Sequence, residues 1–242
     1  PKYVSRTVAV TVDKPTPGTT SGSANGLPKG PTPTPTGDWD AAELAPTGDP
    51  QPAGSSSDWT WLMQQQARWN PCSVIRWGYD ATGSYSGSLA DIKRAFALTA
   101  GRTGLHFKYV GTLDYRAFET THDRPGNVDM VVGWSDANRD PHLSGHVVGV
   151  GGPQASSSGG PWKIFAGSLV LDRDEVLRSG FDVGGAVTWG QVMVHEIGHT
   201  IGLGHAAADT QLMAPTASSR NHRFGAGDLA GMVRVGASGG CF

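Results

Sequence analysis

The segment HEIGHTIGLGH, which runs from His195 to His205, carries three histidines and one glutamate within eleven residues. Imidazole nitrogens are common ligands of divalent transition metals, so this density of histidine indicates a metal site. His195 and His199 are four residues apart, and on a helix such a pair lies on one face, one turn apart. Both rings can therefore bind a single ion.

A third ligand requires the chain to turn back sharply after the helix. Gly202 lies between His199 and His205, and glycine adopts the positive φ of such a turn without steric cost. We therefore expect His205 to be the third ligand. Three neutral imidazoles leave the fourth position of a tetrahedral zinc ion for water, which is the arrangement of a catalytic site. One zinc ion is expected, although cobalt, nickel or copper could occupy the same histidines in vitro.

Glu196 follows the first histidine directly, so on a helix it is rotated by about 100° from His195. From that position its carboxylate can reach a water molecule at the metal without replacing it as a ligand. We predict that Glu196 is the general base of a hydrolytic reaction. The same residues could arise by chance on a solvated helix face, but the extended spacing makes that interpretation the weaker one.

The residues before the motif predict the helix that positions it. Thr188 and Gln191 have the spacing of a capping box, and Val187 and Val192 occupy the positions of a hydrophobic staple. A helix is therefore expected to begin near Trp189.

The extended pattern HExxHxxGxxH resembles the zinc-binding motif of the metzincin metallopeptidases, which also have a methionine turn beneath the metal. Met213, eight residues after His205 in the segment QLMAP, fits that turn. The short gap between His205 and Met213 and the sequence pattern Leu-Met-x-Pro are most similar to the matrixin branch, including its secreted bacterial members. The resemblance implies zinc ligation by His195, His199 and His205, water activation by Glu196, and a hydrophobic floor formed by Met213.

The chain departs from the matrixin pattern at several positions. Ala214 and Ala217 stand where the family usually has tyrosines, so side-chain preference cannot be transferred. Val170 replaces the histidine of a second, structural zinc site, so a single zinc is expected. The segment LVLDRDEV is similar to the family's calcium-binding segment, and whether calcium binds near Asp172 and Glu175 stays open. Neither cysteine matches the family's propeptide cysteine, which leaves the means of latency open.

The remaining patterns predict an α+β (α/β) fold around the site. A helix is expected at residues 88–100, with Ser88 as N-cap and Gly101 as the stop. Strands are expected at residues 73–79, 105–110, 128–134, 145–152 and 163–172. The resemblance implies a metzincin-like catalytic domain, with a twisted mixed sheet of about five strands, a packed helix, an active-site helix and a C-terminal helix.

An extended peptide is expected to bind as an added strand along an edge of this sheet. Residues 145–152 are the candidate edge, because their glycines permit close approach of another backbone.

The composition changes near residue 57. Residues 1–57 are rich in Pro, Thr, Gly and Ser and are predicted to be a mostly disordered linker or propeptide remnant. Residues 3–12 within them alternate in part like a strand. Residues 58–242 are predicted to be the metalloprotease catalytic domain.

Charge and hydropathy exclude other classes of partner. The formal net charge is -2 and only 17% of residues are charged, so there is no basic field for nucleic acid. No segment approaches the roughly 18 to 20 uninterrupted apolar residues of a membrane-spanning helix. We expect a monomer that neither binds nucleic acid nor inserts into a membrane.

Two cysteines, Cys72 and Cys241, lie far apart in the chain. A disulfide between them would close a long loop and stabilise the fold, whereas two unpaired thiols are the alternative. The pairing is favoured, and it indicates an oxidising compartment. The protein is therefore expected to be secreted and extracellular.

Together these patterns predict a secreted zinc metalloendopeptidase that hydrolyses peptide bonds in a protein or peptide substrate. Two alternatives stay open. One is a non-catalytic, zinc-stabilised surface binding module, which the presence of Glu196 disfavours. The other is a hydrolase of a non-peptide amide.

Overall fold

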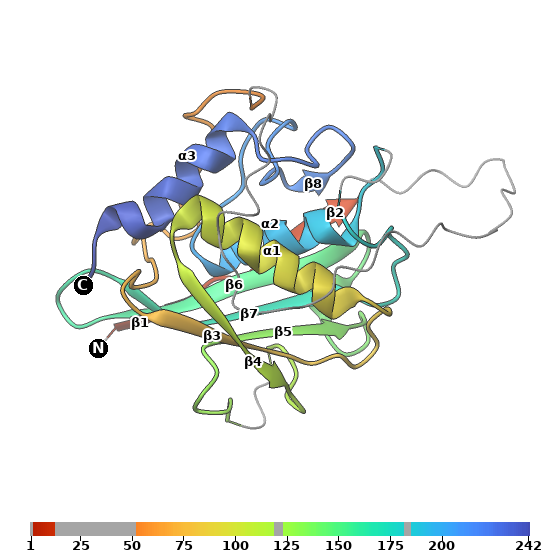
Figure 1. Ribbon diagram of the computed structural model, residues 1–242, viewed down its shortest axis with the longest axis horizontal. Coiled ribbons are helices and arrows are strands. Elements are labelled where there is room, and N and C mark those ends of the chain that lie inside the picture. The colour runs from red at the N-terminus through yellow and green to blue at the C-terminus, as the bar shows by residue number, and fades with distance from the viewer. Residues whose placement is uncertain (1, 13–51, 119–122, 182–184) are drawn as a thin grey trace, which may run out of the picture.

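The computed structural model describes residues 2–12, 52–118, 123–181 and 185–242 (Figure 1). No helix in these ranges is long and apolar enough to cross a membrane. The strands there are β1 (Lys2–Ser5), β2 (Val8–Val12), β3 (Val74–Tyr79), β4 (His106–Thr112), β5 (Met130–Ser135), β6 (Val147–Ser157), β7 (Lys163–Asp172) and β8 (Thr216–Ala217). The helices are α1 (Ser88–Thr103), α2 (Trp189–Thr200) and α3 (Ala226–Val235), with short 3-10 turns η2 (Pro141–Leu143) and η3 (Ala237–Gly239).

All the described strands belong to one mixed sheet with the order β4-β3-β5-β7-β6-β2-β8, and β1 also pairs with β6. Strands β4, β3, β5 and β7 are parallel, whereas β6 is antiparallel to β7. Figure 1 shows the helices on one face of the sheet. Helix α2 contacts α1 as well as β6 and β7. Every residue of β5 is buried, as its uninterrupted apolar run predicts.

The predicted fold class is confirmed. Strands β3 to β7 form the five expected strands, α1 is the packed helix, α2 carries the histidine motif and α3 is the C-terminal helix. The sheet is nevertheless larger than the predicted five strands, because β1, β2 and β8 extend it. Strand β8 has only two residues, which is too short to produce a recognisable alternation in the sequence.

Helix α1 begins at Ser88, but its N-cap is Gly87 and not Ser88 as predicted. The Ser88 hydroxyl is instead hydrogen-bonded to the Tyr79 hydroxyl at 2.7 Å. The predicted stop at Gly101 is also wrong, because the helix continues to Gly104, which has φ 69°. A single glycine costs a helix only about 1 kcal/mol, so Gly101 is tolerated, while the left-handed conformation of Gly104 ends the helix.

An aromatic cluster fixes α1 on the sheet. The Trp77 ring of β3 stacks on Phe96 of α1, with 4.3 Å between ring centroids. Trp134 of β5 donates a hydrogen bond from Nε1 to the Tyr79 hydroxyl at 2.7 Å. Helix α1, held on the sheet in this way, packs against α2.

The predicted pairing of Cys72 and Cys241 is confirmed, since the two residues form a disulfide. The Asn70 side-chain amide donates to the Phe242 carbonyl at 2.9 Å, and the Arg68 guanidinium lies 4.6 Å from the centroid of the Phe242 ring. The C-terminus is therefore fastened to the segment that leads into β3.

The N-terminal strands cover β6, which was predicted to be an open edge. Strands β1 and β2 both pair antiparallel with β6, and β2 also pairs in parallel with β8. The strand signal in residues 3–12 is thus confirmed, and the expectation that residues 145–152 form a free edge is corrected. Residues 13–51 lie outside the described residues, and the predicted division of the chain at residue 57 stays a prediction.

Candidate metal centre

Helix α2 presents the histidine motif from a fully buried position. The Thr188 side chain accepts a hydrogen bond from the Gln191 backbone N–H at 3.2 Å, so the helix has the predicted N-cap. Gln191 does not complete the capping box. Its side-chain amide donates instead to the Ser218 carbonyl at 3.1 Å and to Asn221 Oδ1 at 2.7 Å, which ties the start of the helix to the segment that follows Met213.

The chain leaves α2 through a sharp turn at Gly202. This residue has φ 108°, the positive value for which a glycine was expected, and a Cβ there would lie 2.7 Å from the Ala67 carbonyl oxygen. The Leu203 backbone N–H then donates to the Gly198 carbonyl at 3.0 Å. This return of the chain brings His205 back over the helix.

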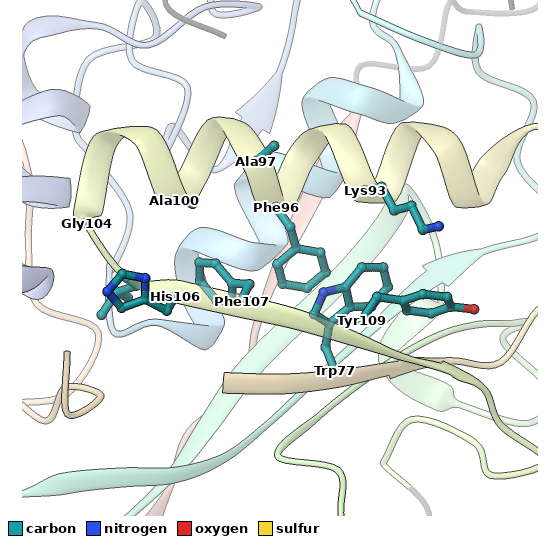
Figure 2. Close-up of a pocket in the computed structure, with 10 residues that line it drawn as sticks. Trp77, Lys93, Phe96, Ala97, Ala100, Gly104, His106, Phe107 and Tyr109 are labelled. Atoms are coloured by element: carbon teal, nitrogen blue, oxygen red, sulfur yellow. The ribbon is translucent and has the colours of Figure 1, made fainter. Parts of the chain in front are cut away.

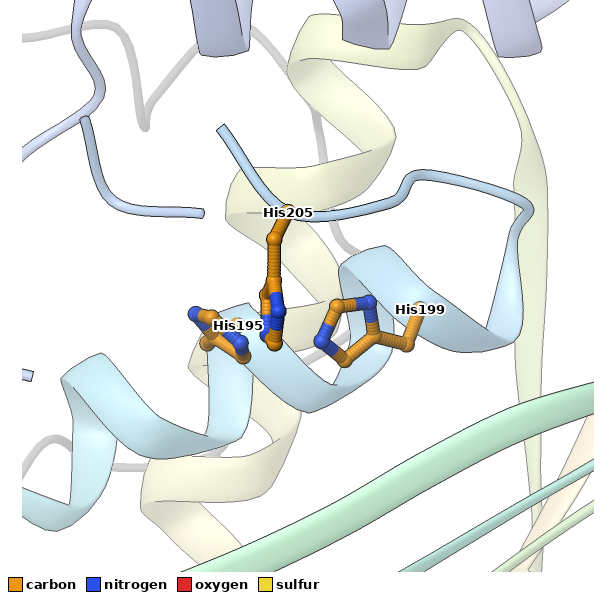
Figure 3. Close-up of side chains that lie close together, drawn as sticks. All are labelled: His195, His199 and His205. Carbon is orange, nitrogen blue, oxygen red and sulfur yellow. The ribbon is translucent and has the colours of Figure 1, made fainter. Parts of the chain in front are cut away.

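The three histidines of the motif converge. Figure 3 shows the rings of His195 and His199 from α2 and the ring of His205 pointing toward one another. One ring nitrogen from each lies within 4.8 Å of the other two. Among the described residues, this is the one group of three or more His, Cys, Asp or Glu side chains whose ligand atoms converge.

Backbone carbonyls orient two of the rings. Nδ1 of His195 lies 2.8 Å from the Leu212 carbonyl oxygen, and Nδ1 of His199 lies 2.7 Å from the Leu203 carbonyl oxygen. Because a carbonyl oxygen can only accept, each Nδ1 carries the proton and each Nε2 has a free lone pair. This arrangement, in which the second ring nitrogen is fixed by a hydrogen bond, is typical of metal-binding histidines.

The Nε2 atoms of all three histidines are buried without a hydrogen-bond partner. Burial lowers the pKa of His195 to about 3, with a further contribution from His205. Burial also lowers the pKa of His199 and of His205, and the positive charge of Arg6 adds to both effects. Buried polar atoms are rarely left unpaired, so three neutral, unpaired nitrogens directed at one point fit a metal ion with imidazole ligands.

The Glu196 side chain is also fully buried, and neither carboxyl oxygen has a hydrogen-bond partner. Burial raises its pKa well above the usual value, and the nearby Val10 backbone N–H offsets this rise in part. The carboxyl group lies against the glycines of β6. A Cβ on Gly149 would be 3.0 Å from Oε1, and a Cβ on Gly151 would be 2.8 Å from Oε2. Burial therefore favours the protonated form of this carboxyl group.

Met213 packs directly beneath α2. A Cβ on Gly198 would lie 2.6 Å from Met213 Sδ, so the missing side chain makes room for the sulfur. Asp228 accepts hydrogen bonds from the backbone N–H groups of Leu212 and Met213, and also from that of Gly225. Sequence reasoning missed both Gly198 and Asp228. The position of Asp228 in the first turn of α3, three residues after Gly225, was the signal available.

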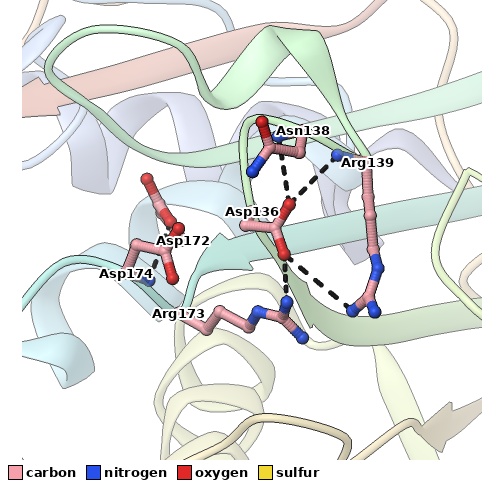
Figure 4. Close-up of polar contacts among 6 residues, drawn as sticks. All are labelled: Asp136, Asn138, Arg139, Asp172, Arg173 and Asp174. Carbon is pink, nitrogen blue, oxygen red and sulfur yellow. Dashed lines mark hydrogen bonds and ion pairs between the residues drawn. The ribbon is translucent and has the colours of Figure 1, made fainter.

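The acidic segment after β7 does not form a comparable group. Figure 4 shows Asp136 accepting backbone hydrogen bonds from Asn138 and Arg139, at 3.0 Å and 3.1 Å, and pairing with the Arg173 guanidinium. Asp172 accepts a hydrogen bond from the Asp174 backbone N–H at 2.9 Å. The guanidinium groups of Arg173 and Arg139 therefore supply positive charge at Asp136.

A hollow beneath α1 is separate from the histidines. It has a volume of about 250 Å³, and Figure 2 shows it beneath α1, with Trp77, Phe96 and Tyr109 on its walls. The Lys93 ammonium lies 4.7 Å from the centroid of the Tyr109 ring. None of the motif residues lines this hollow.

Comparisons with known proteins match the part of the chain that contains the histidine motif. The profile of the matrixin family matches residues 79–235. Matrilysin from Rattus norvegicus is 25% identical over 179 residues, which make up 72% of this chain and 60% of matrilysin. The chain thus spans less than two thirds of the length of that relative. The range matched by the family profile contains the three converging histidines, Glu196 and Met213.

Proposed function

The protein belongs to the matrixin family, whose profile covers more than half of the chain, and from that premise we propose that it is a secreted zinc-dependent endopeptidase. We assign residues 58–242 as its catalytic domain, which acts as a monomer on a protein or peptide substrate. His195, His199 and His205 hold one zinc ion, Glu196 is the general base, and Met213 and Gly202 support the site.

One observation carries this proposal: three buried, unpaired imidazole nitrogens lie within 4.8 Å of one another, with a buried carboxyl group on the same helix. Three neutral histidines are a donor set that favours zinc and leaves it open to substrate. Bound there, zinc supplies Lewis acidity to the scissile carbonyl and to the attacking water molecule.

Glu196 moves the protons of the reaction. Its carboxylate accepts one proton from water as the water oxygen attacks the carbonyl carbon, and the resulting carboxylic acid donates that proton to the leaving amine nitrogen as the C–N bond breaks. Burial raises the pKa of Glu196, which favours its uptake of the proton from water. Burial keeps other water away from the carboxyl group.

The substrate backbone pairs with β6. Gly149 and Gly151 of β6 lie against Glu196. An extended peptide adds as a strand to the edge of β6 away from β7, in the place where β2 pairs. Ala214 and Ala217 stand where matrixins usually have tyrosines, so the pocket beside the scissile bond has a wall without an aromatic ring.

The disulfide between Cys72 and Cys241 supports secretion, since such bonds persist in oxidising compartments. Separation of culture medium from cells, followed by immunoblotting, tests this part of the proposal. We expect the protein in the medium with the disulfide intact.

The experiment that tests the activity is digestion of casein, with product termini identified by mass spectrometry. Glu196→Gln should reduce turnover by at least about a hundredfold and leave zinc content unchanged. Asp114→Asn makes the same chemical change at an exposed carboxylate and should retain activity. Equal, measurable turnover by the wild type and Glu196→Gln would refute the role of Glu196, and absence of peptide-bond cleavage by the zinc-loaded protein, with β2 paired to β6 or displaced from it, would refute the endopeptidase.

A further inference from the structure

Strand β2 is hydrogen-bonded on both of its edges. It runs antiparallel to β6 on one side and parallel to β8 on the other. The Thr11 backbone N–H donates to the Pro215 carbonyl at 3.1 Å, and the Val12 backbone N–H donates to the His146 carbonyl at 3.0 Å. Strand β2 is therefore held by hydrogen bonds between β6, the candidate substrate-binding strand, and β8, which follows Met213.

The side chains and backbone of this segment fit the surface that receives them. Val10 is completely buried and Val12 is 9% exposed. A Cβ on Gly152 of β6 would lie 2.0 Å from the Arg6 carbonyl oxygen and 2.9 Å from Thr7 Cα. The three atoms nearest to that added Cβ all belong to residues 6 and 7. The missing side chain of Gly152 therefore makes room for the N-terminal segment itself.

The segment also crosses the candidate catalytic residues. Val8 and Val10 pair with Gly151 and Gly149 of β6, the two glycines that lie against the Glu196 carboxyl group. Glu196 is the group that we propose donates a proton to the leaving amine nitrogen. The N-terminal segment therefore lies along the part of β6 that borders the proposed proton donor.

We propose that residues 6–12 are a pseudosubstrate that inhibits the enzyme in cis by occupying its peptide-binding cleft. This inference rests on the proposed endopeptidase function and adds its regulation. The inhibition uses main-chain pairing and two buried valines, so it requires no cysteine near the metal. Because the segment is covalently joined to the domain, its effective concentration is of the order of millimolar, and weak pairing is sufficient to compete with substrate.

The first test compares two substitutions that add the same charge to the full-length protein. Val10→Asp places a carboxylate in a completely buried position and should release the segment, whereas Ser5→Asp places it at an exposed position of β1. With a quenched fluorescent peptide substrate, Val10→Asp should raise kcat/KM by at least about tenfold, with zinc content unchanged. Ser5→Asp should stay within about twofold of the wild type.

The second test supplies the segment in trans to Val10→Asp protein whose zinc content matches that of the wild type, which shows that the metal site of the variant is folded. A synthetic peptide of residues 5–12, SRTVAVTV, should inhibit the Val10→Asp protein competitively, raising KM without changing kcat. The same peptide carrying V10D should be at least about tenfold weaker.

The outcomes separate the two proposals. Equal Glu196-dependent activity in the wild type and in Val10→Asp, with no inhibition by the peptide, would overturn the pseudosubstrate and leave the endopeptidase intact. Absence of peptide hydrolysis by any zinc-loaded variant would overturn both. Activity that appears only in Val10→Asp and is suppressed by the peptide supports both.

Discussion

At the scale of single residues, the metal-binding character of the site depends on what the histidines do with their second nitrogen. Leu212 and Leu203 provide carbonyl oxygens that hold the Nδ1 protons of His195 and His199. The Nε2 lone pairs then face the centre of the group without a competing donor. The rings are therefore oriented and neutral before any ion binds, which reduces the cost of ordering them.

The raised pKa of Asp228 predicts that the free energy of unfolding depends on pH. Burial raises its pKa to about 6, although three backbone N–H groups partly oppose the shift. Since the folded state binds this proton more tightly than the unfolded chain, the contribution of Asp228 to stability is greatest below about pH 4 and is lost as the pH rises through about 6. The loss should be about 3 kcal/mol in the free energy of unfolding.

Urea denaturation between pH 4 and 7 measures this effect, with metal removed from both proteins. Asp228→Asn cannot titrate, so the difference in unfolding free energy between wild type and variant should decrease across this range. A difference that is constant with pH would show that Asp228 does not titrate as inferred.

The residues that the sequence could reveal are those whose relation to one another is local. His195, His199 and Glu196 lie on one helix, and Gly202 and His205 follow within two turns, so spacing alone was sufficient. Asp228 is different, because it supports the Met213 turn from another helix. Nothing in the spacing of the chain places these two residues in contact before the fold is known.

At the scale of secondary-structure elements, α2 depends on close packing with the turn beneath it. The Gly198 position contacts Met213 Sδ and Cε so closely that a Cβ would lie 2.6 Å and 2.9 Å from them. This contact joins the helix that carries two histidines to the segment whose Leu212 carbonyl orients one of them. A change at Gly198 should therefore affect both stability and the geometry of the site.

The same substitution in two helices should have opposite effects. Gly198→Ala should lower the free energy of unfolding by about 1–3 kcal/mol, because the added methyl group overpacks against Met213. Gly101→Ala in α1 meets no atom within 4 Å and should raise stability by about 0.5–1 kcal/mol, since alanine favours the helix. Chemical denaturation of both variants compares them directly. Stabilisation by Gly198→Ala would contradict the close packing described for the methionine turn.

Elements with strong periodicity were predicted well, and the differences have physical causes. Helix α1 and strands β3 to β7 have long apolar patterns that survive in the fold. The end of α1 was placed too early, because a helix held by tertiary packing tolerates Gly101. The pairing of β6 with β1 and β2 was missed because register between distant segments depends on contacts across the sheet.

At the scale of the whole molecule, the disulfide joins the segment before β3 to the end of the chain. Cys72 and Cys241 are 169 residues apart, so the bond restricts a large part of the unfolded chain. Their pairing could be predicted because the chain has only two cysteines. The contacts of Phe242 with Asn70 and Arg68 could not be predicted, since they exist only once both ends lie side by side.

Replacing both cysteines by serine should lower the free energy of unfolding by about 2–5 kcal/mol. The reason is that the reduced unfolded chain gains conformational entropy over a long loop. Thermal unfolding with and without a reducing agent measures the effect. The reductant should lower the Tm of the wild type and leave that of Cys72→Ser/Cys241→Ser unchanged. Identical Tm values for both proteins under oxidising conditions would show that the bond contributes nothing to stability.

The most direct measurement of the central claim is the metal content of purified protein by inductively coupled plasma mass spectrometry. We expect one zinc per chain in the wild type and in His142→Ala, whose side chain is exposed and lies outside the converging group. His199→Ala should lose most of the metal, because two imidazoles bind zinc far more weakly than three. Zinc absent from the wild type, or retained equally by His199→Ala, would contradict a metal centre formed by His195, His199 and His205.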